Sequence, residues 1–135
     1  MDGMEDLDQA LASLDPQIEG RFIYTSAPEV PDGLVPFATV RETEGVTLVV
    51  SVEDAAQFGY DTSNPFSRIT ARVHTSLLSV GITATVTATI ASRGIPCNVI
   101  AGLRHDYFLV PASREDEALA LLQALSTQAQ GWLAD

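Results

Sequence analysis

The spacing of apolar residues in the first third of the chain predicts a helix followed by a strand. Four apolar residues recur every three or four positions, as on one helical face: Met4, Leu7, Leu11 and Leu14. Pro16 lies just past the end of this pattern, where helices commonly stop. The apolar and β-branched run at residues 22–25 then predicts a strand.

The middle of the chain carries a hairpin signal and a helix start. Residues 36–52 contain two β-branched runs separated by Glu44 and Gly45, which predicts a β-hairpin. Ser51, with Asp54 three residues later, forms a capping-box pattern that predicts a short helix. The turn-forming residues 60–65 that follow are the best candidate for a boundary between two half-domains.

The segment after Gly81 supports two interpretations. Residues 69–75 alternate as a strand should, but residues 82–90 combine strict alternation with β-branched side chains, which favours a strand by local propensity. The same segment also puts four residues on one helical face: Ile82, Val86, Thr89 and Ile90. Gly94 and Pro96 beyond it form a helix stop. Propensity alone favours the strand narrowly.

The last third of the chain predicts two strands and a long helix. Strands are expected at residues 97–101 and 106–110, and Ser113 with Asp116 begins the helix with a second capping box. Its predicted inner face is Ala118, Leu122, Leu125 and Ala129. If residues 82–93 are helical, the second half reads strand, helix, strand, strand, helix. That is the order of a split βαβ, ferredoxin-like unit that lacks its last strand.

Composition excludes several classes of function. The chain has 135 residues, 46% of them hydrophobic, which is enough for a packed core. Its formal net charge is −11 and it contains no lysine, so we expect no nucleic-acid partner. No apolar run is long enough to cross a membrane, and the acidic N-terminus differs from a signal peptide, so a cytoplasmic protein is expected. Cys97 is the only cysteine, which rules out an intrachain disulfide.

A few polar residues invite an enzymatic interpretation. His74, Ser76, His105 and Asp106 have the side chains of a hydrolase triad, but the chain has no nucleophile-elbow motif around its serines. The two histidines and Asp106 match no metal-ligand spacing, and there is no glycine-rich phosphate loop. We therefore expect no catalytic residues, no metal and no cofactor.

Two stretches resemble a known family. One runs from His74 to Ala84 and continues from Ala91 to Ile100, and the other runs from Arg41 to Val50. Together they resemble small bacterial tandem ACT-domain proteins, a pattern related to the CASTOR-type arginine sensors. The resemblance implies an α+β fold of ferredoxin-like, ACT-type βαββαβ units. It implies two tandem half-domains, residues 1–65 and 66–135, that share an antiparallel sheet, and it favours a helix at residues 82–93.

The resemblance also implies a regulatory module that binds an amino acid or a similar small ligand, without catalysis, and forms a homodimer. A structural or protein-interaction module with a degenerate pocket is the alternative. The ligand-binding residues it implies are Ser76, Val80, Gly81, Ile82, Thr83, Asn98, Ile100, Glu42 and Glu44. A glycine permits close backbone approach, and N–H groups that open a helix favour a carboxylate. Glu42 and Glu44 would meet a ligand's ammonium or guanidinium group, but they also fit solvated hairpin charges.

Overall fold

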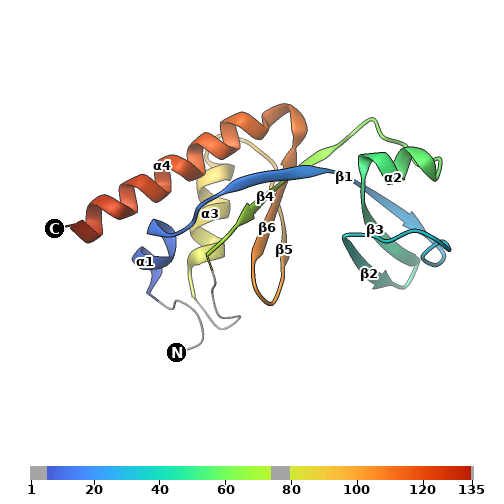
Figure 1. Ribbon diagram of the computed structural model, residues 1–135, viewed down its shortest axis with the longest axis horizontal. Helices are drawn as coiled ribbons and strands as arrows, with labels where there is room; N and C mark the ends of the chain where they lie inside the picture. Colours follow the sequence, from blue (N-terminus) through green and yellow to red (C-terminus); the bar gives the residue numbers. More distant parts are fainter. Residues whose placement is uncertain (1–5, 74–79, 135) are drawn as a thin grey trace.

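The computed structural model describes residues 6–73 and 80–134. Figure 1 shows a curved sheet with three helices gathered at one end and a short helix at the other. The elements in chain order are α1 (Leu7–Ala12), β1 (Gln17–Ala27), β2 (Ala38–Glu42), β3 (Gly45–Ser51), α2 (Val52–Gln57), β4 (Phe66–Ala71), α3 (Ile82–Ala91), β5 (Asn98–Ala101), β6 (Asp106–Pro111) and α4 (Glu115–Ala134), with a 3-10 turn at Ala112–Arg114 before α4.

The six strands form one antiparallel sheet in the order β2-β3-β1-β4-β6-β5. This order is symmetric about its centre, because the hairpin β2-β3 lies beside β1 as the hairpin β5-β6 lies beside β4. Phe22 of β1 is the register partner of Phe66 of β4 at that centre. The two halves of the chain therefore build one continuous sheet, as expected from the sequence.

β1 belongs to both halves of the sheet. Its residues 22–27 pair with β3, and its residues 17–22 pair with β4, with a register shift between Ile18 and Arg21. In a ferredoxin-like βαββαβ unit the last strand lies beside the first. Among the described residues no strand follows α4, and β1 occupies the position beside β4 that this strand would fill. In the first half, β4 takes the same position beside β1.

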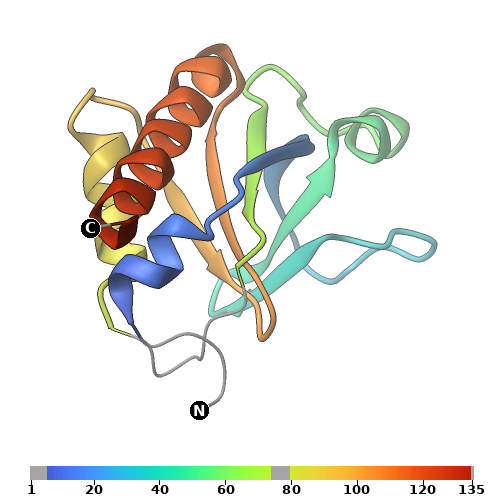
Figure 2. The same cartoon turned by 60° about the vertical axis from the view of Figure 1, so that its left-hand side comes forward.

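The two faces of the sheet carry separate clusters of apolar residues. The largest cluster packs one face against α1, α3 and α4, with Phe108, Ile69, Leu122 and Ile90 fully buried. These three helices line one side of the sheet in Figure 2. A second cluster around Leu48 and Val50 includes Ala55 of α2.

The opposite face carries a third cluster, which we call the aromatic face. It consists of the buried residues Phe22, Val49 and Leu109, with Phe37, Phe66 and Tyr107 packed against them. Phe37 contacts Phe22 and Tyr107, with ring centroids 5.3 and 5.0 Å away. Phe37 comes from the segment before β2 and Tyr107 from β6. Their contact shows that the sheet curls strongly enough to bring its two halves together.

The ambiguous threonine-rich segment is the helix α3, and local propensity alone was wrong. Ile82, Val86 and Ile90 are buried in the main core, and the burial of this face stabilises the helix. The threonine hydroxyls donate back to the helix, Thr87 Oγ1 to the carbonyl of Thr83 and Thr89 Oγ1 to that of Thr85, each at 2.8 Å. Such bonds let β-branched threonine sit in a helix with its polar group satisfied.

The other predicted elements differ from the structure mainly at their ends. The hairpin turns at 43–44, and the Ser51 hydroxyl caps α2 by accepting from the Asp54 N–H at 3.1 Å. The first strand is longer than residues 22–25, because its pairing with β4 begins at Gln17. The strand predicted at 69–75 starts earlier, at Phe66, and ends at Ala71. Residues 74 and 75 of that prediction lie outside the described residues.

Candidate functional site

The N-terminus of α3 is the first candidate, because it holds the predicted glycine loop. Gly81 is the N-cap residue, with φ of 97° in the left-handed region and no side-chain cap. The Thr85 N–H donates to the Gly81 carbonyl at 2.9 Å and starts the helical ladder. The first N–H groups of a helix have no partner within it and attract anions. This end of α3 can therefore accept a carboxylate through its backbone.

The predicted neighbours of Gly81 differ in how they could take part. Val80 is 83% exposed and Thr83 is partly buried, so both side chains can be reached from solvent. Ile82 is 5% exposed and packs in the main core, so only its backbone is available to a ligand. Ser76 lies outside the described residues, as does His74.

Asn98 and Ile100 lie on the other side of the sheet from α3. Ile100 is the register partner of Tyr107 and packs against the cluster on the aromatic face. Asn98 is two residues before it, and side chains two apart on a strand point to the same face. The strand β5 therefore does not bring these two side chains together with Gly81 and Thr83 within one chain.

Glu42 and Glu44 lie at the tip of the β2-β3 hairpin, at the far end of the molecule from α3 (Figure 1). Both are exposed, and Glu42 accepts a hydrogen bond from the Thr47 hydroxyl. The structure therefore separates the eight predicted residues that it describes into three places: the start of α3, the β5 edge of the aromatic face, and this hairpin tip.

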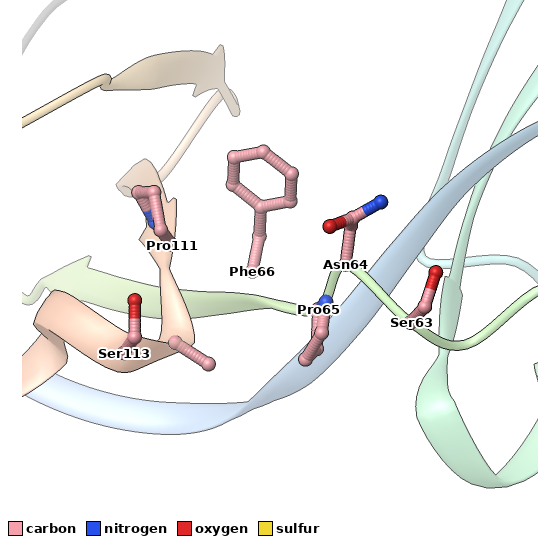
Figure 3. A pocket seen from close by; sticks show the side chains of 7 residues that line it. Ser63, Asn64, Pro65, Phe66, Pro111 and Ser113 are labelled. Atoms are coloured by element: carbon pink, nitrogen blue, oxygen red, sulfur yellow. The ribbon is translucent and has the colours of Figure 1, made fainter.

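A cavity of about 360 Å³ lies where β4 begins and β6 ends. Its lining is Ser63, Asn64, Pro65, Phe66, Pro111, Ala112 and Ser113. Figure 3 shows the Phe66 ring, the Asn64 amide and the Ser113 hydroxyl directed to the same side of the backbone. The lining contains hydroxyl and amide groups but no charged side chain, so it suits a small neutral group. None of these residues was predicted as part of a site.

Arg68 of β4 occupies the centre of the aromatic face. Its guanidinium carbon lies 4.7 Å from the ring centroid of Phe22, 4.5 Å from that of Phe37 and 5.4 Å from that of Tyr107. Its Nε is buried and has no hydrogen-bond partner among the described residues. The sequence analysis missed Arg68, because it lies before the predicted start of the strand at residue 69.

Thr70, the next residue of β4 on the same face, has a second unpartnered atom. It is 3% exposed, and its Oγ1 is buried without a hydrogen-bond partner among the described residues. The hydroxyl lies close enough to Glu19 to be the first cause of that carboxyl's lowered pKa, although the two do not reach hydrogen-bond geometry. The charges of Arg72 and Arg68 lower the Glu19 pKa further, and Arg72 forms an ion pair with it.

Of the four residues considered for catalysis, the structure describes only His105 and Asp106. Asp106 is 9% exposed, and burial raises its pKa while the neighbouring His105 lowers it by a smaller amount. Burial also raises the pKa of the Cys97 thiol to about 11, so the thiol stays protonated at neutral pH. Within residues 6–73 and 80–134, no three histidine, cysteine, aspartate or glutamate side chains come together as a metal site would require.

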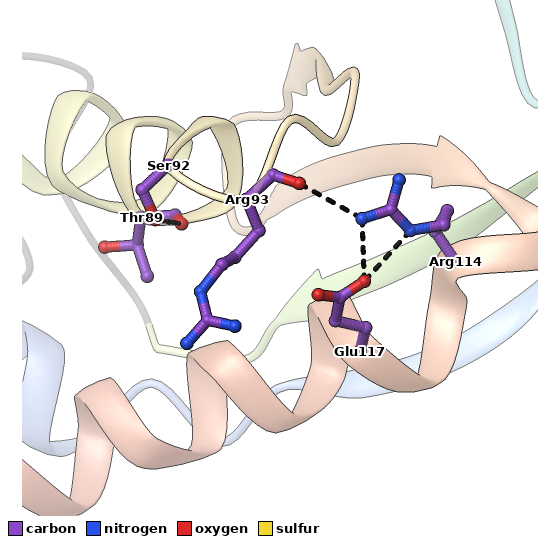
Figure 4. A network of polar contacts seen from close by, with 5 residues as sticks. All are labelled: Thr89, Ser92, Arg93, Arg114 and Glu117. Carbon is purple, nitrogen blue, oxygen red and sulfur yellow. Dashed lines mark hydrogen bonds and ion pairs between the residues drawn. The ribbon is translucent and has the colours of Figure 1, made fainter.

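Arg114 ties the end of α3 to the start of α4. Its guanidinium donates to Glu117 Oε1 at 2.9 and 2.7 Å and to the Arg93 carbonyl at 3.1 Å (Figure 4). Ser92 and Thr89 close the last turn of α3 through a 2.6 Å hydrogen bond. These contacts hold the C-terminal end of α3 against α4. They therefore help to fix the position of α3 on the sheet.

Comparison with known protein families gives one match, over about half of the chain. The ACT domain family matches residues 2–67, which run from before α1 to the start of β4. None of the described helices is both long and apolar enough to span a bilayer. No curated protein matches the chain.

Three solved structures are similar to this one. A Vibrio cholerae protein of unknown function, described as a possible transport protein, is 38% identical with a TM-score of 0.76, and the match covers 85% of this chain and 92% of that one. An Agrobacterium tumefaciens protein is 19% identical, with a TM-score of 0.62 over 82% of this chain and 87% of that one. Aspartokinase alpha and beta subunits are 11% identical, with a TM-score of 0.53 over 81% and 98%.

The last two likenesses show the fold, whereas the first has the identity and coverage of a true relative. The chain therefore belongs to the same family as the Vibrio cholerae protein, and its residues 2–67 are similar to the ACT domain family.

Proposed function

We propose that this protein is a non-catalytic regulatory module that binds a small ligand, most simply an amino acid, through the start of α3. The proposal rests on the geometry of Gly81, the N-cap residue of α3. Its φ is 97°, and no side chain makes a capping hydrogen bond to the start of the helix. An amino-acid carboxylate can accept hydrogen bonds from the free N–H groups of the first helical turn. The ACT domain match and the fold shared with aspartokinase subunits support a regulatory role.

The proposed architecture is a pair of ACT-like units, residues 1–65 and 66–135, that exchange strands. The symmetric strand order supports it, because β1 completes the second unit and β4 completes the first. The ACT domain match ends at residue 67, close to the proposed boundary. The tandem arrangement is also what a CASTOR-type relationship would require.

We propose that the protein works as a homodimer in the cytoplasm. The strands β2 and β5 are the two edges of the sheet, and Val40 and Val99 on them are 55% and 37% exposed. Edge strands offer unpaired backbone groups to a second chain. In a dimer, Glu42 and Glu44 of one chain can lie beside the Gly81 loop of the other chain. Within one chain they lie far from it. Light scattering should give twice the 14.4 kDa mass of one chain at micromolar concentration.

A thermal-shift screen across the twenty amino acids tests the proposed function. A ligand at 100 times its dissociation constant stabilises the folded state by about 2.7 kcal/mol, so the midpoint of unfolding should rise by several degrees. We expect one amino acid or a small chemical group of them to give a saturable rise. A screen in which none does so would favour the alternative, a structural or protein-interaction module of the same fold.

A further inference from the structure

Arg68 differs from the other arginines in its surroundings. Arg21, Arg72 and Arg114 each form an ion pair with a glutamate. The remaining arginines are exposed to solvent: Arg41, Arg93 and Arg104. Arg68 is partly buried and has no ion pair with any residue of the described ranges. A partly buried cation in a chain of net charge −11 calls for an anionic partner.

The aromatic rings fix the plane of this guanidinium. Phe22 and Phe37 lie within 4.7 Å of its central carbon, and Tyr107 lies at 5.4 Å. Contacts with ring faces hold an arginine without using its N–H donors, which remain free in the plane of the group. A planar carboxylate matches such a fork through two parallel hydrogen bonds.

Thr70 adds a second polar group on the same face. Its buried Oγ1 has no partner among the described residues, so a polar atom of a ligand would satisfy it. Glu19 forms its ion pair with Arg72, and the Thr70 hydroxyl and the charge of Arg68 also lower the pKa of Glu19. Ile100, beside Tyr107 on the next strands, gives the same face an apolar margin.

From these contacts we infer that the aromatic face is a second binding site, which takes a small organic carboxylate with an apolar body. The Arg68 guanidinium binds the carboxylate, the Thr70 hydroxyl donates to one of its oxygens, and the apolar body packs against Tyr107 and Ile100. This site lies across the sheet from Gly81 and does not depend on the ligand proposed there.

Nuclear magnetic resonance titration of the full chain with sodium benzoate tests this inference, with benzamide as the uncharged control. In the parent protein, benzoate should shift the Arg68 Nε–H signal and the Thr70 and Leu109 amide signals saturably, with a dissociation constant on the order of 1 mM. Benzamide, at matched ionic strength, should leave them unchanged, because it lacks the carboxylate. Equal shifts with both compounds, or no saturable shift with benzoate, would overturn the inference.

Variants separate binding from folding. Arg68→Lys keeps the charge but loses the planar fork, so benzoate should bind about tenfold more weakly. Thr70→Val keeps the shape and removes the hydroxyl, and should also weaken binding. Arg41→Met removes an exposed arginine of β2 and should bind as the parent does. Folding of each variant is checked by amide signal dispersion. A folded Arg68→Lys protein that binds benzoate as tightly as the parent would show that Arg68 is not the carboxylate site.

Discussion

Phe22 of β1 lies directly opposite Phe66 of β4, and this pair marks the point where the two halves of the sheet meet. From it, β1 runs on to pair with β3, and β4 pairs along its whole length with β6. β1 also brings Arg21 to Glu115 of α4, through hydrogen bonds of 3.1 and 2.6 Å. Each half of the chain therefore depends on a strand from the other.

This dependence predicts that residues 66–135 do not fold alone. Without β1, one edge of β4 is unpaired. The core cluster that contains Ile69 also loses Leu11 of α1 and Leu14, which follows α1. The isolated fragment should aggregate or give the circular dichroism of an unfolded chain. Adding a peptide of residues 6–27 should restore a cooperative thermal transition. A fragment that melts cooperatively without the peptide would contradict the shared architecture.

Gly45 should tolerate alanine less well than Gly33. A Cβ at Gly45 would lie 2.8 Å from the Ala27 carbonyl oxygen, and its φ of 144° is unfavourable for other residues. Gly33 also has positive φ, at 82°, but open space around its Cβ position. Gly33→Ala should cost about 1 kcal/mol of unfolding free energy from backbone strain. Gly45→Ala should cost clearly more in urea denaturation, and equal losses would mean that the close approach of the two strands is not rigid.

Removing the Thr70 hydroxyl should not destabilise the fold. Thr70→Val keeps the side-chain shape and removes a buried oxygen that lacks a hydrogen-bond partner among the described residues, and this gain offsets the lost interaction with the Glu19 carboxylate, so the free energy of unfolding should change by well under about 1 kcal/mol. Ser126→Ala is the matched control, since that hydroxyl is 7% exposed and donates to the Ala12 carbonyl at 3.2 Å. The control should lose about 1 kcal/mol in urea unfolding. A similar loss in Thr70→Val would show that its hydroxyl has a structural partner.

Asp106 should make stability depend on pH. Burial raises its pKa above the ordinary value of 3.8, so the folded state favours the protonated form. The protonated Asp106 carboxyl therefore contributes to the free energy of unfolding at pH values below 3.8. This contribution is lost as the pH rises through the pKa of Asp106 in the folded state. Asp106→Asn should therefore stabilise the protein at pH 7, and the gain should shrink as the pH falls toward 4. A gain that is the same at every pH would assign the effect to packing instead of charge.

Local signals in the sequence predicted the local structure well. The hairpin and the Ser51 cap depend on residues close together in the sequence, and both are present, although the hairpin turns at residues 43–44, one position before the predicted Glu44-Gly45. The threonine-rich segment was ambiguous, because its strand propensity competes with core contacts that only the folded chain supplies. Ile82, Val86 and Ile90 make these contacts in α3.

Long-range relationships could not be predicted in the same way. The N-terminal end of β1 consists mostly of polar residues, such as Glu19 and Arg21, and therefore gives little indication of a strand from the sequence alone. Its pairing with β4 is a contact between segments some fifty residues apart, set by register and core packing. The surroundings of Arg68 could not be predicted for the same reason, because its three neighbouring rings come from β1, from the segment before β2 and from β6. The described site residues fall into three groups that are close only within the sequence, at residues 80–83, 98–100 and 42–44, and the sequence could not show that the fold keeps these groups apart.

Calorimetric titration of Gly81 variants tests the proposed function most directly, using the amino acid that the thermal-shift screen returns. A Cβ at Gly81 would meet only the Leu7 side chain, at 3.4 Å, so Gly81→Ala should fold with a loss of about 1–3 kcal/mol from its positive φ. Glu42→Gln is the control for charge at the hairpin tip. We predict that Gly81→Val, checked by circular dichroism to be folded, no longer binds, and that Gly81→Ala binds more weakly than the parent. A folded Gly81→Val protein that binds the same amino acid as tightly as the parent would contradict the account.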